Sequence, residues 1–416
     1  MVKEIKVPEL LVPANNLNIL RYAVQYGADA VYVGGRKFNL RSLGENFTLA
    51  ELKKGIDYAH TRGVKVYFTL NSVIFDHEIK EFKEYLNELK KINFDAVIVS
   101  DFGAIESLKE VIPDAKLHIS TQVNTLNHLG VRFWENLGAS RVNLARETKF
   151  SDLKNIIRNT NIEIEVFVHG ALCISYSGRC MLSKYMAGRD ANRGECAHSC
   201  RWKYHLLEEE RPNLFFPIEQ DAKGTHIYNS RDLCLLAKLK LLADTGVDCF
   251  KIEGRMKTEN YVSLTTWVYR KALEYIKQNK FTGQKISYLM NVLSKTSHRN
   301  FTEGFMFLDD YRELQENDSV HYVNEYKFVG VCRGYSEKYN GPIVKVKNQF
   351  KQGEVFDILQ PDVDPLKFNI SKIILYNSNN NNGGKDKEIS CANPNDVVII
   401  PNLKNLNPYA IFRVKI

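Results

Sequence analysis

Long apolar runs and the signatures of secreted proteins are missing from this sequence. No stretch approaches the roughly 18 consecutive apolar residues that a transmembrane helix needs, so no membrane span is expected. The N-terminal segment MVKEIKVPELLVPANN has no long apolar run after its basic residues, so it is not typical of a signal peptide. We therefore expect a cytoplasmic protein, in which thiols stay reduced and disulfide frameworks are rare.

The common catalytic motifs are also missing. No Walker loop, GxGxxG, HExxH or GxSxG occurs in a supporting context. The C-x3-C-x2-C motif of radical enzymes is absent, because Arg201, Trp202 and Lys203 follow Cys200. A Cys–His peptidase built from Cys173 and His169, only four residues apart, is the hydrolase arrangement left open.

Composition indicates an ordinary globular protein. The 416 residues are 44% hydrophobic and 25% charged, enough for two or three domains with a large core. The net charge of +8 is compatible with nucleic-acid binding without requiring it.

The first 280 residues alternate short apolar strands with amphipathic helices, each strand largely β-branched or aromatic. The pattern predicts an α/β fold with a (β/α)8 TIM-like barrel, and an open doubly wound sheet is the alternative. The eight expected strands are Glu9–Val12, Ala30–Val33, Lys65–Leu70, Ala96–Ser100, Lys116–Ser120, Arg141–Ala145, Glu163–Val168 and Asp248–Ile252.

The pattern changes after about residue 280. Residues 281–324 are mixed and polar and are interpreted as a linker or excursion. Residues 325–416 are expected to form a small C-terminal all-β barrel domain, since short strands are separated by turn sequences. Its expected strands are Phe328–Cys332, Pro342–Val346, Val355–Leu359, Lys372–Leu375, Val397–Ile400 and Ile411–Val414.

Polar residues follow the strand ends, where chemistry is located in such barrels. The candidates are Gln122, Arg146, Glu147, His169 and Arg255, the last preceded by Glu253. Opposite charges at two ends of one barrel mouth suggest a functional site, although loops are often polar for other reasons.

Cysteines are absent from the first 172 residues and then cluster. Cys173, Cys180, Cys196 and Cys200 lie within 28 residues, and Cys234 follows. The first four fall in an insertion of about residues 171–228 after the seventh strand, which would overhang the carboxyl face. Clustered thiols indicate a metal or iron–sulfur site, with buried structural cysteines as the alternative. Only Cys196 and Cys200 have the spacing of a zinc knuckle, so a [4Fe-4S] cluster is preferred and zinc is the alternative.

The same insertion carries cations and aromatic residues. Such side chains suit the phosphates and unstacked bases of RNA, although an ordinary solvated surface has a similar composition. The candidate RNA-binding residues are Arg179, Arg193, Arg201, Trp202 and Lys203.

Several long motifs resemble the peptidase U32 family. The longest is the block from Glu165 to Ser183, EVFVHGALCISYSGRCMLS. Supporting blocks are YGADAVYVGG (26–35), STQVN (120–124), NRGECAHSCRW (192–202), SRDLC (230–234) and KIEGRMK (251–257). The match runs in order from about residue 9 to 275, and the C-terminal β-segment is similar to the small barrel of one family branch.

That branch contains tRNA hydroxylation proteins, so the resemblance implies synthesis of 5-hydroxyuridine at the wobble uridine of tRNA, with prephenate as co-substrate and oxygen source. It also implies a [4Fe-4S] cluster: Cys173, Cys180, Cys196 and Cys234 match one relative's ligand pattern, and Cys200 matches a Cys-x3-Cys pair in another. Arg146 or Arg255 would clamp the small anionic co-substrate, and His169 would transfer protons or, as a buried histidine, orient the cluster loop.

The expected partners are tRNA, the anionic co-substrate and a paralogue in a hetero- or homo-oligomer. Two other functions remain open: a U32-type peptidase, and a non-catalytic RNA-binding protein with structural zinc.

Overall fold

The structure, a computed structural model, describes residues 7–42, 44–173, 175–202, 219–221, 224–226, 230–309, 314, 322–376, 386–404 and 406–416. In the described part of the chain, no helix is both long and apolar enough to cross a membrane.

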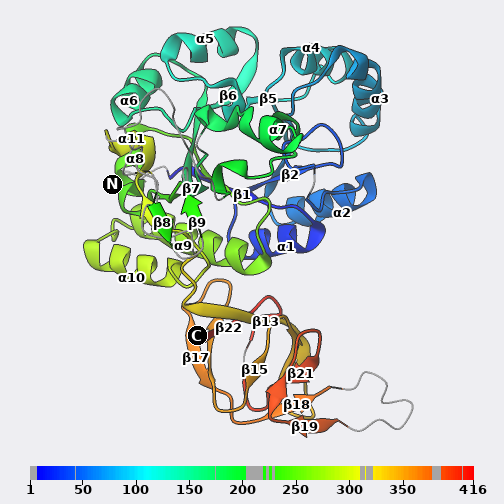
Figure 1. The fold of residues 1–416 in the computed structure, drawn as a ribbon, viewed down its shortest axis with the longest axis vertical. Helices are drawn as coiled ribbons and strands as arrows, with labels where there is room; N and C mark the ends of the chain where they lie inside the picture. Colours follow the sequence, from blue (N-terminus) through cyan, green and yellow to red (C-terminus); the bar gives the residue numbers. More distant parts are fainter. Residues whose placement is uncertain are drawn as a thin grey trace.

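Eight parallel strands close into a barrel, as the sequence predicts (Figure 1). Closure comes from β7 and β11, which pair in parallel from Cys249 opposite Glu165 to Lys251 opposite Phe167, and this pairing excludes the open sheet. The strands are β1 (Glu9–Pro13), β2 (Ala30–Gly34), β3 (Lys65–Leu70), β4 (Ala96–Val99), β5 (Leu117–Ile119), β6 (Ala139–Asn143), β7 (Glu163–Ala171) and β11 (Cys249–Ile252).

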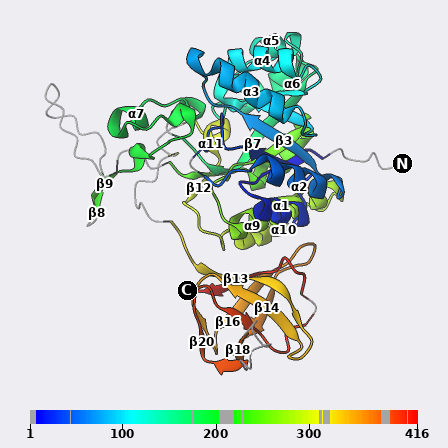
Figure 2. The ribbon, with the colours of Figure 1, turned by 90° about the vertical axis from the view of Figure 1, so that its right-hand side faces the viewer.

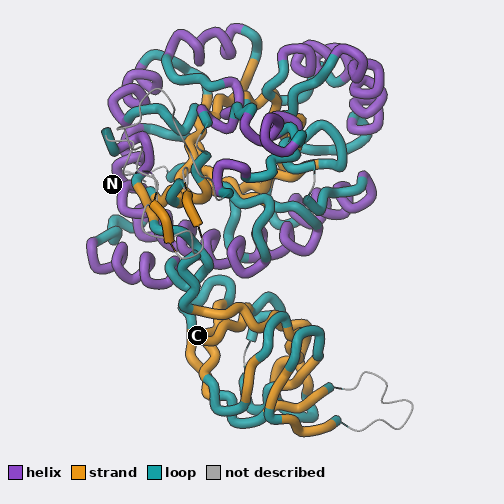
Figure 3. The backbone as a smooth tube through the Cα atoms, viewed as in Figure 1, coloured by secondary structure: helices purple, strands orange, loops and turns teal. Residues whose placement is uncertain are grey.

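Helices cover the outside of the barrel (Figure 3). Their ends follow local capping rules: the Asn16 side chain accepts from the Ile19 N–H, and Thr48 forms a capping box with Glu51. The helices that follow the strands are α1 (Leu17–Gln25), α2 (Leu49–His60), α3 (Ile79–Leu89), α4 (Phe102–Val111), α5 (His128–Asn136), α6 (Phe150–Arg158), α8 (Leu239–Thr245) and α9 (Glu259–Lys277).

Strand burial explains the apolar runs of the sequence. Outward side chains such as Leu10, Phe68 and Val166 join the core beneath the helices. Inward side chains, Tyr32, Tyr67 and Ile98 among them, form a second cluster inside the barrel. Because both faces of the sheet are covered, the strands need apolar residues at nearly every position.

Residues 281–324 contain more structure than the sequence interpretation allowed. Helix α10 (Gly283–Leu293) packs against α9 and buries Leu289, Val292 and Leu293. Because the other face of α10 is polar, the sequence of this segment shows no clear helical periodicity of apolar residues. Strand β12 (Phe301–Thr302) then pairs with β10 (Asp232–Cys234), and β10 lies antiparallel to the end of β7; α11 (Gly304–Phe307) follows.

The C-terminal region is a separate antiparallel all-β unit, as expected (Figures 1 and 2). Its main sheet has the order β17-β16-β22-β13-β14-β21-β18-β19, and β15 pairs with β20. The strands are β13 (Tyr326–Ser336), β14 (Gly341–Val346), β15 (Phe350–Lys351), β16 (Val355–Leu359), β17 (Leu366–Asn369), β18 (Ile373–Leu375), β19 (Lys387–Ile389), β20 (Cys391–Ala392), β21 (Val397–Ile399) and β22 (Ile411–Lys415).

Buried contacts join the two units. The Tyr26 hydroxyl at the end of α1 hydrogen-bonds the carbonyl oxygens of Leu359 (3.0 Å) and Tyr409 (2.9 Å). Lys295, just after α10, pairs with buried Asp357 of β16, which also accepts from Arg413. Separation of the units would break the contacts of Tyr26 and Lys295, whereas Asp357 would keep its contact with Arg413 inside the C-terminal unit.

Candidate functional site

The insertion after β7 lies over the carboxyl face of the barrel, as the sequence predicts. It contains η3 (Tyr176–Gly178), α7 (Leu182–Ala187), η4 (Ala191–Arg193) and η5 (Ser199–Arg201), and Figure 2 shows α7 standing clear of the barrel helices at one end of the barrel. The backbone strands β8 (Glu219–Asp221) and β9 (Gly224–His226) belong to the same insertion.

Hydrogen bonds anchor the insertion to loops that follow several barrel strands. The Val73 N–H after β3 donates to the Asn192 carbonyl at 3.2 Å. After β5, Asn124 Nδ2 donates to the Tyr176 carbonyl (2.9 Å) and the Gln122 carbonyl accepts from Arg179 Nε (2.6 Å). These loops all lie at the carboxyl ends of parallel strands, so the cysteine segment covers the end where barrel enzymes hold substrate.

Glu147, after β6, holds the turn between the first two cysteines. Its Oε1 accepts from the Ser177 backbone N–H at 2.6 Å, and its Oε2 accepts from the Ser177 hydroxyl. The Ser177 Oγ also accepts from the Arg146 N–H at 3.1 Å. Ser177 has φ +44°, a conformation unfavourable for a residue with a Cβ, so the carboxylate contacts help to offset this cost. Glu147 therefore has a positioning role.

A carboxylate held by two arginines occupies the mouth. Glu253 Oε1 lies 3.1 Å from Arg41 Nη2, and Glu253 Oε2 lies 3.5 Å from Arg146 Nη2. Burial alone would raise the pKa of Glu253, but Arg41, Arg146 and Arg255 outweigh it and hold that pKa below its ordinary value. Three cations around one carboxylate leave a surplus of positive charge, which favours an anionic ligand.

Arg255 lies deeper than the other two arginines. It is 4% exposed and donates to Thr69 Oγ1 at 2.6 Å and to Asn39 Oδ1. Burial, reinforced by Arg41, lowers its pKa to about 10. A Cβ at Gly34 would lie 2.5 Å from Arg255 Nη1, so the glycine at the end of β2 leaves room for the guanidinium. Arg255 therefore lies beneath the other two arginines, where it is held by Thr69 and Asn39.

Arg41 is the functional candidate that sequence reasoning missed. It lies in the loop between β2 and α2, far in sequence from Glu253, and its side chain is 38% exposed. The sequence feature that could have identified Arg41 is its place in a long loop at the carboxyl end of a strand. This feature is weakly specific, because such loops commonly carry charged residues.

Three of the predicted cysteines lie near enough to one another for two of their thiols to affect the pKa of the third. Burial raises the pKa of the Cys173 thiol, while nearby Arg146 lowers it and the thiols of Cys180 and Cys196 raise it further. Cys196 also lies close enough to Arg41 to affect its pKa. These thiols have the soft-donor chemistry that an iron–sulfur cluster or zinc requires.

The fourth ligand is not distinguished. Cys234 is buried in β10, with Sγ 3.8 Å from Tyr269 Oη and 3.9 Å from Met290 Sδ, on the α9 and α10 side of the barrel wall. Burial raises its pKa to about 11. Cys200 is half-buried in η5. Across the described ranges, no three His, Cys, Asp or Glu side chains stand in metal-binding geometry. The donors fit a cluster by chemistry, but their positions do not form a closed site.

His169 is enclosed at the end of β7. Its ring is 2% exposed and lies against Tyr261, Tyr269 and Phe301, with centroids 5.4 to 5.9 Å apart. Burial lowers its pKa to about 3, so it is neutral near pH 7. This environment favours a role in orienting the cysteine loop; proton transfer by His169 stays a prediction.

The remaining predicted residues are dispersed over the insertion and the loop after β5. Gln122 lies under Gly178, and its buried Oε1 has no partner in the part of the chain that the structure describes. Arg193 is bonded to Glu78, and Trp202 is 40% exposed. Lys203 and the side chain of Arg201 lie outside the described residues.

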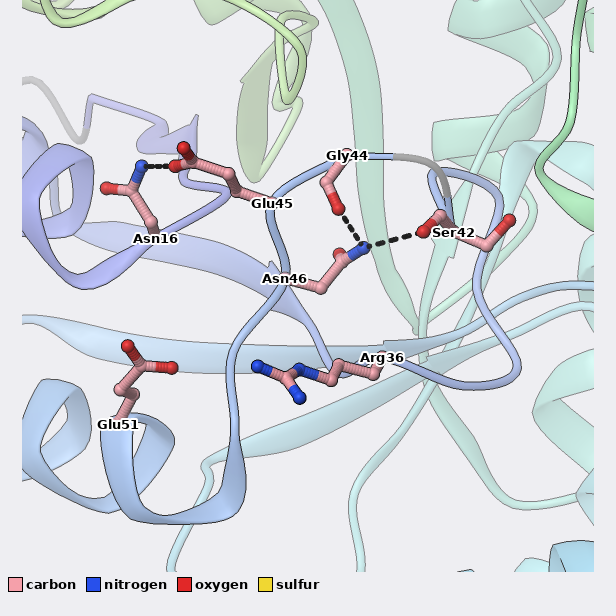
Figure 4. A pocket seen from close by; sticks show the side chains of 7 residues that line it. All are labelled: Asn16, Arg36, Ser42, Gly44, Glu45, Asn46 and Glu51. Carbon is pink, nitrogen blue, oxygen red and sulfur yellow. Dashed lines mark hydrogen bonds between the residues drawn. The ribbon is translucent and has the colours of Figure 1, made fainter.

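A pocket of about 430 Å³ opens beside the mouth (Figure 4). It lies along the loop that carries Arg41, between the ends of β1 and β2. Arg36 and Glu51 are on one side, and Asn46 donates to the Ser42 and Gly44 carbonyls (Figure 4). Its mixed charge indicates no particular ligand.

Known proteins match nearly the whole chain. The family model described as Peptidase family U32 matches residues 15–316, and that of the Peptidase family U32 C-terminal domain matches residues 324–413. The chain is similar to "tRNA hydroxylation protein P1" of Bacillus subtilis, with 36% identity over 88% of this chain and 87% of that protein.

Two further relatives carry different names. "Uncharacterized protease MJ0090" of Methanocaldococcus jannaschii is 37% identical over 84% of this chain and 83% of its own length. "23S rRNA 5-hydroxycytidine C2501 synthase" of Escherichia coli is 34% identical over 72% of this chain and 45% of its own length.

Proposed function

The chain belongs to peptidase family U32, and we propose that it is an enzyme that hydroxylates the wobble uridine of tRNA to 5-hydroxyuridine. The observation that supports this most is the mouth itself, where Glu253 lies between Arg41 and Arg146 beside Cys173 and Cys196. The names of the relatives, a tRNA hydroxylation protein and an rRNA hydroxycytidine synthase, agree with hydroxylation of RNA.

Hydroxylation at C5 replaces a C–H bond with a C–OH bond, which is a two-electron oxidation. An oxygen donor must therefore take up two electrons, and we propose prephenate, a dicarboxylate, for this role. Arg146 and Arg41 are the proposed carboxylate clamp, because Arg255 is occupied by Thr69 and Asn39. The bound anion would neutralise the excess positive charge of the arginines around Glu253.

A [4Fe-4S] cluster is the proposed cofactor, with zinc as the alternative. Cys173, Cys180 and Cys196 would hold it with Cys200 or Cys234, and it would supply redox chemistry next to the anion site. Glu147 would fix the turn between Cys173 and Cys180, and the insertion would cover part of the mouth.

The peptidase alternative receives less support. A cysteine nucleophile needs a lowered pKa and a nearby base, whereas burial raises the pKa of Cys173. Burial lowers the pKa of His169 to about 3, and its Nδ1 has no hydrogen-bond partner among the described residues. We propose a cytoplasmic enzyme that acts alone or with a paralogue, since its tRNA substrate is found there.

Nucleoside analysis tests the proposal. Total tRNA from cells lacking this protein and its paralogues should lose 5-hydroxyuridine and the nucleosides derived from it, and the gene supplied in trans should restore them. Unchanged wobble nucleosides in the deletion strain would contradict the proposal. Cleavage of gelatin by purified protein, abolished by Cys173→Ala, would instead support the peptidase.

A further inference from the structure

Large apolar side chains at helix α7 are exposed to solvent, while its one buried residue, Ser183, is polar. Tyr185 is 87% exposed and Met181 is 64% exposed. They are four residues apart, so they share one helical face, and the Tyr185 N–H donates to the Met181 carbonyl at 2.9 Å.

The one fully buried residue of α7 is polar. Ser183 is 2% exposed, and its hydroxyl donates to the Arg189 carbonyl (2.7 Å) and accepts from the Ala197 N–H (2.9 Å). A surface helix ordinarily shows the reverse arrangement, with apolar residues inward. Tyr185, which is almost wholly exposed, therefore adds little to the packing of the helix, which suggests a partner.

The surroundings of this face are cationic. Residues 175–202 contain five lysines and arginines but only two acidic residues. Lys184, next to Tyr185 in the sequence, is exposed and lies 3.1 Å from Asp190 Oδ2, and Arg179 and Arg189 are also exposed. Arg189 is positioned by the carbonyl oxygens of Glu195 and Cys196, at 3.2 and 3.4 Å.

We propose that Tyr185, supported by Met181, is a stacking platform for an unpaired base of the RNA substrate, with Lys184 and Arg189 contacting the adjacent phosphates. This inference rests on the proposed function and specifies how the insertion binds that substrate. One exposed aromatic face is sufficient to stack a base. A protein partner would need about 800 Å² of contact surface, which is more than these few side chains offer, and the cations suit a polyanion better.

Binding of a fluorescently labelled anticodon-arm RNA to the full chain, followed by anisotropy, tests the platform. We expect Tyr185→Ala to raise Kd about tenfold and Tyr185→Phe to keep Kd within about twofold, since the ring rather than the hydroxyl stacks. The matched control is Phe133→Ala, because Phe133 on α5 is also exposed (51%) but lies outside the insertion. Circular dichroism of each variant excludes unfolding as the cause.

Salt dependence separates stacking from charge. Tyr185→Ala should leave the slope of log Kd against log salt unchanged, whereas Lys184→Ala should reduce it by about one. Equal Kd for Tyr185→Ala and wild type, or no binding of the RNA by wild type, overturns the platform. So does a loss of self-association in Tyr185→Ala, measured by sedimentation, with unchanged RNA binding.

The platform and the proposed function can fail separately. If deletion leaves wobble nucleosides unchanged but Tyr185→Ala still weakens RNA binding, the hydroxylase fails and the platform stands. If deletion removes 5-hydroxyuridine but Tyr185→Ala binds RNA normally, the platform alone fails.

Discussion

Glu147 and Ser177 form a two-point contact in which both carboxylate oxygens are used by one residue, through its backbone N–H and its hydroxyl. The contact joins the end of a barrel strand to the turn between Cys173 and Cys180. A residue chosen from the sequence as catalytic thus has both its oxygens engaged in holding a loop.

Removing the Glu147 carboxylate should destabilise the protein and loosen the cysteine turn. We expect Glu147→Ala to lower the free energy of unfolding by about 1.5–3 kcal/mol, the usual range for hydrogen bonds to a charged group. Urea denaturation measures this. In a double-mutant cycle with Ser177→Ala the two changes should be non-additive, because both remove the contact between the Ser177 hydroxyl and Glu147 Oε2, while Ser177→Ala keeps the backbone N–H contact to Oε1.

The control for Glu147→Ala is Glu84→Ala, since Glu84 is an exposed residue of α3. Additive effects of Glu147→Ala and Ser177→Ala would show that the two residues act independently and would contradict this interpretation.

Glu78 should make the anchoring of the insertion pH-dependent. Its pair with Arg193, followed by the Phe75 N–H, lowers the pKa of Glu78 from 4.5 to about 2 despite partial burial. A lowered folded-state pKa stabilises the protein at pH values above the unfolded pKa, and this contribution is lost as pH falls through the folded pKa. The stability difference between wild type and Glu78→Gln should therefore shrink between about pH 5 and pH 2.

Denaturation of wild type and Glu78→Gln across this pH range measures the effect, with Glu81→Gln as the control because Glu81 pairs with Lys37 at an exposed site. If the difference in stability between wild type and Glu78→Gln stays constant with pH, the pKa of Glu78 is the same in the folded and unfolded protein and this prediction is wrong.

Arg146→Ala should weaken binding of the anionic co-substrate. Loss of one charge-assisted contact predicts an increase in KM for prephenate of about 10- to 100-fold. Arg36→Ala, in the neighbouring pocket, is the matched control and should leave KM unchanged. If Arg146→Ala lowers kcat at an unaltered KM, the carboxylate clamp has been assigned to the wrong residue.

Cysteine substitutions should identify the cluster ligands. We expect Cys173→Ala, Cys180→Ala and Cys196→Ala to lose most iron and acid-labile sulfide after anaerobic purification, whereas Cys249→Ala, a fully buried thiol in β11, should keep both. Comparing Cys200→Ala with Cys234→Ala then identifies the fourth ligand. One zinc per chain and no iron in wild type would contradict the iron–sulfur proposal.

The barrel and the position of the insertion could be predicted from the sequence, because they depend on local patterns. Strands buried on both faces, such as Ala30–Gly34 and Ala96–Val99, need apolar side chains almost throughout. Gly27, Gly63 and Gly138, which follow barrel helices, have φ of 98°, 73° and 81°, the left-handed conformation that glycine adopts at helix C-termini. Helix α10 was missed because only one narrow face, with Leu289 and Val292, is buried.

Tertiary structure alone decided what the charged residues do. Arg41 and Glu253 are 212 residues apart and meet only because β1 links β2 to β11 in the closed sheet. Burial lowers the pKa of His169 to about 3, and the degree of burial cannot be read from the sequence. The packing of the folded chain also brings Cys234 against Tyr269. Sequence thus determined where the carboxyl face and its cysteines lie, through periodicity and chain order. Which charges meet, and which thiols face the mouth, depended on long-range packing that no local pattern encodes.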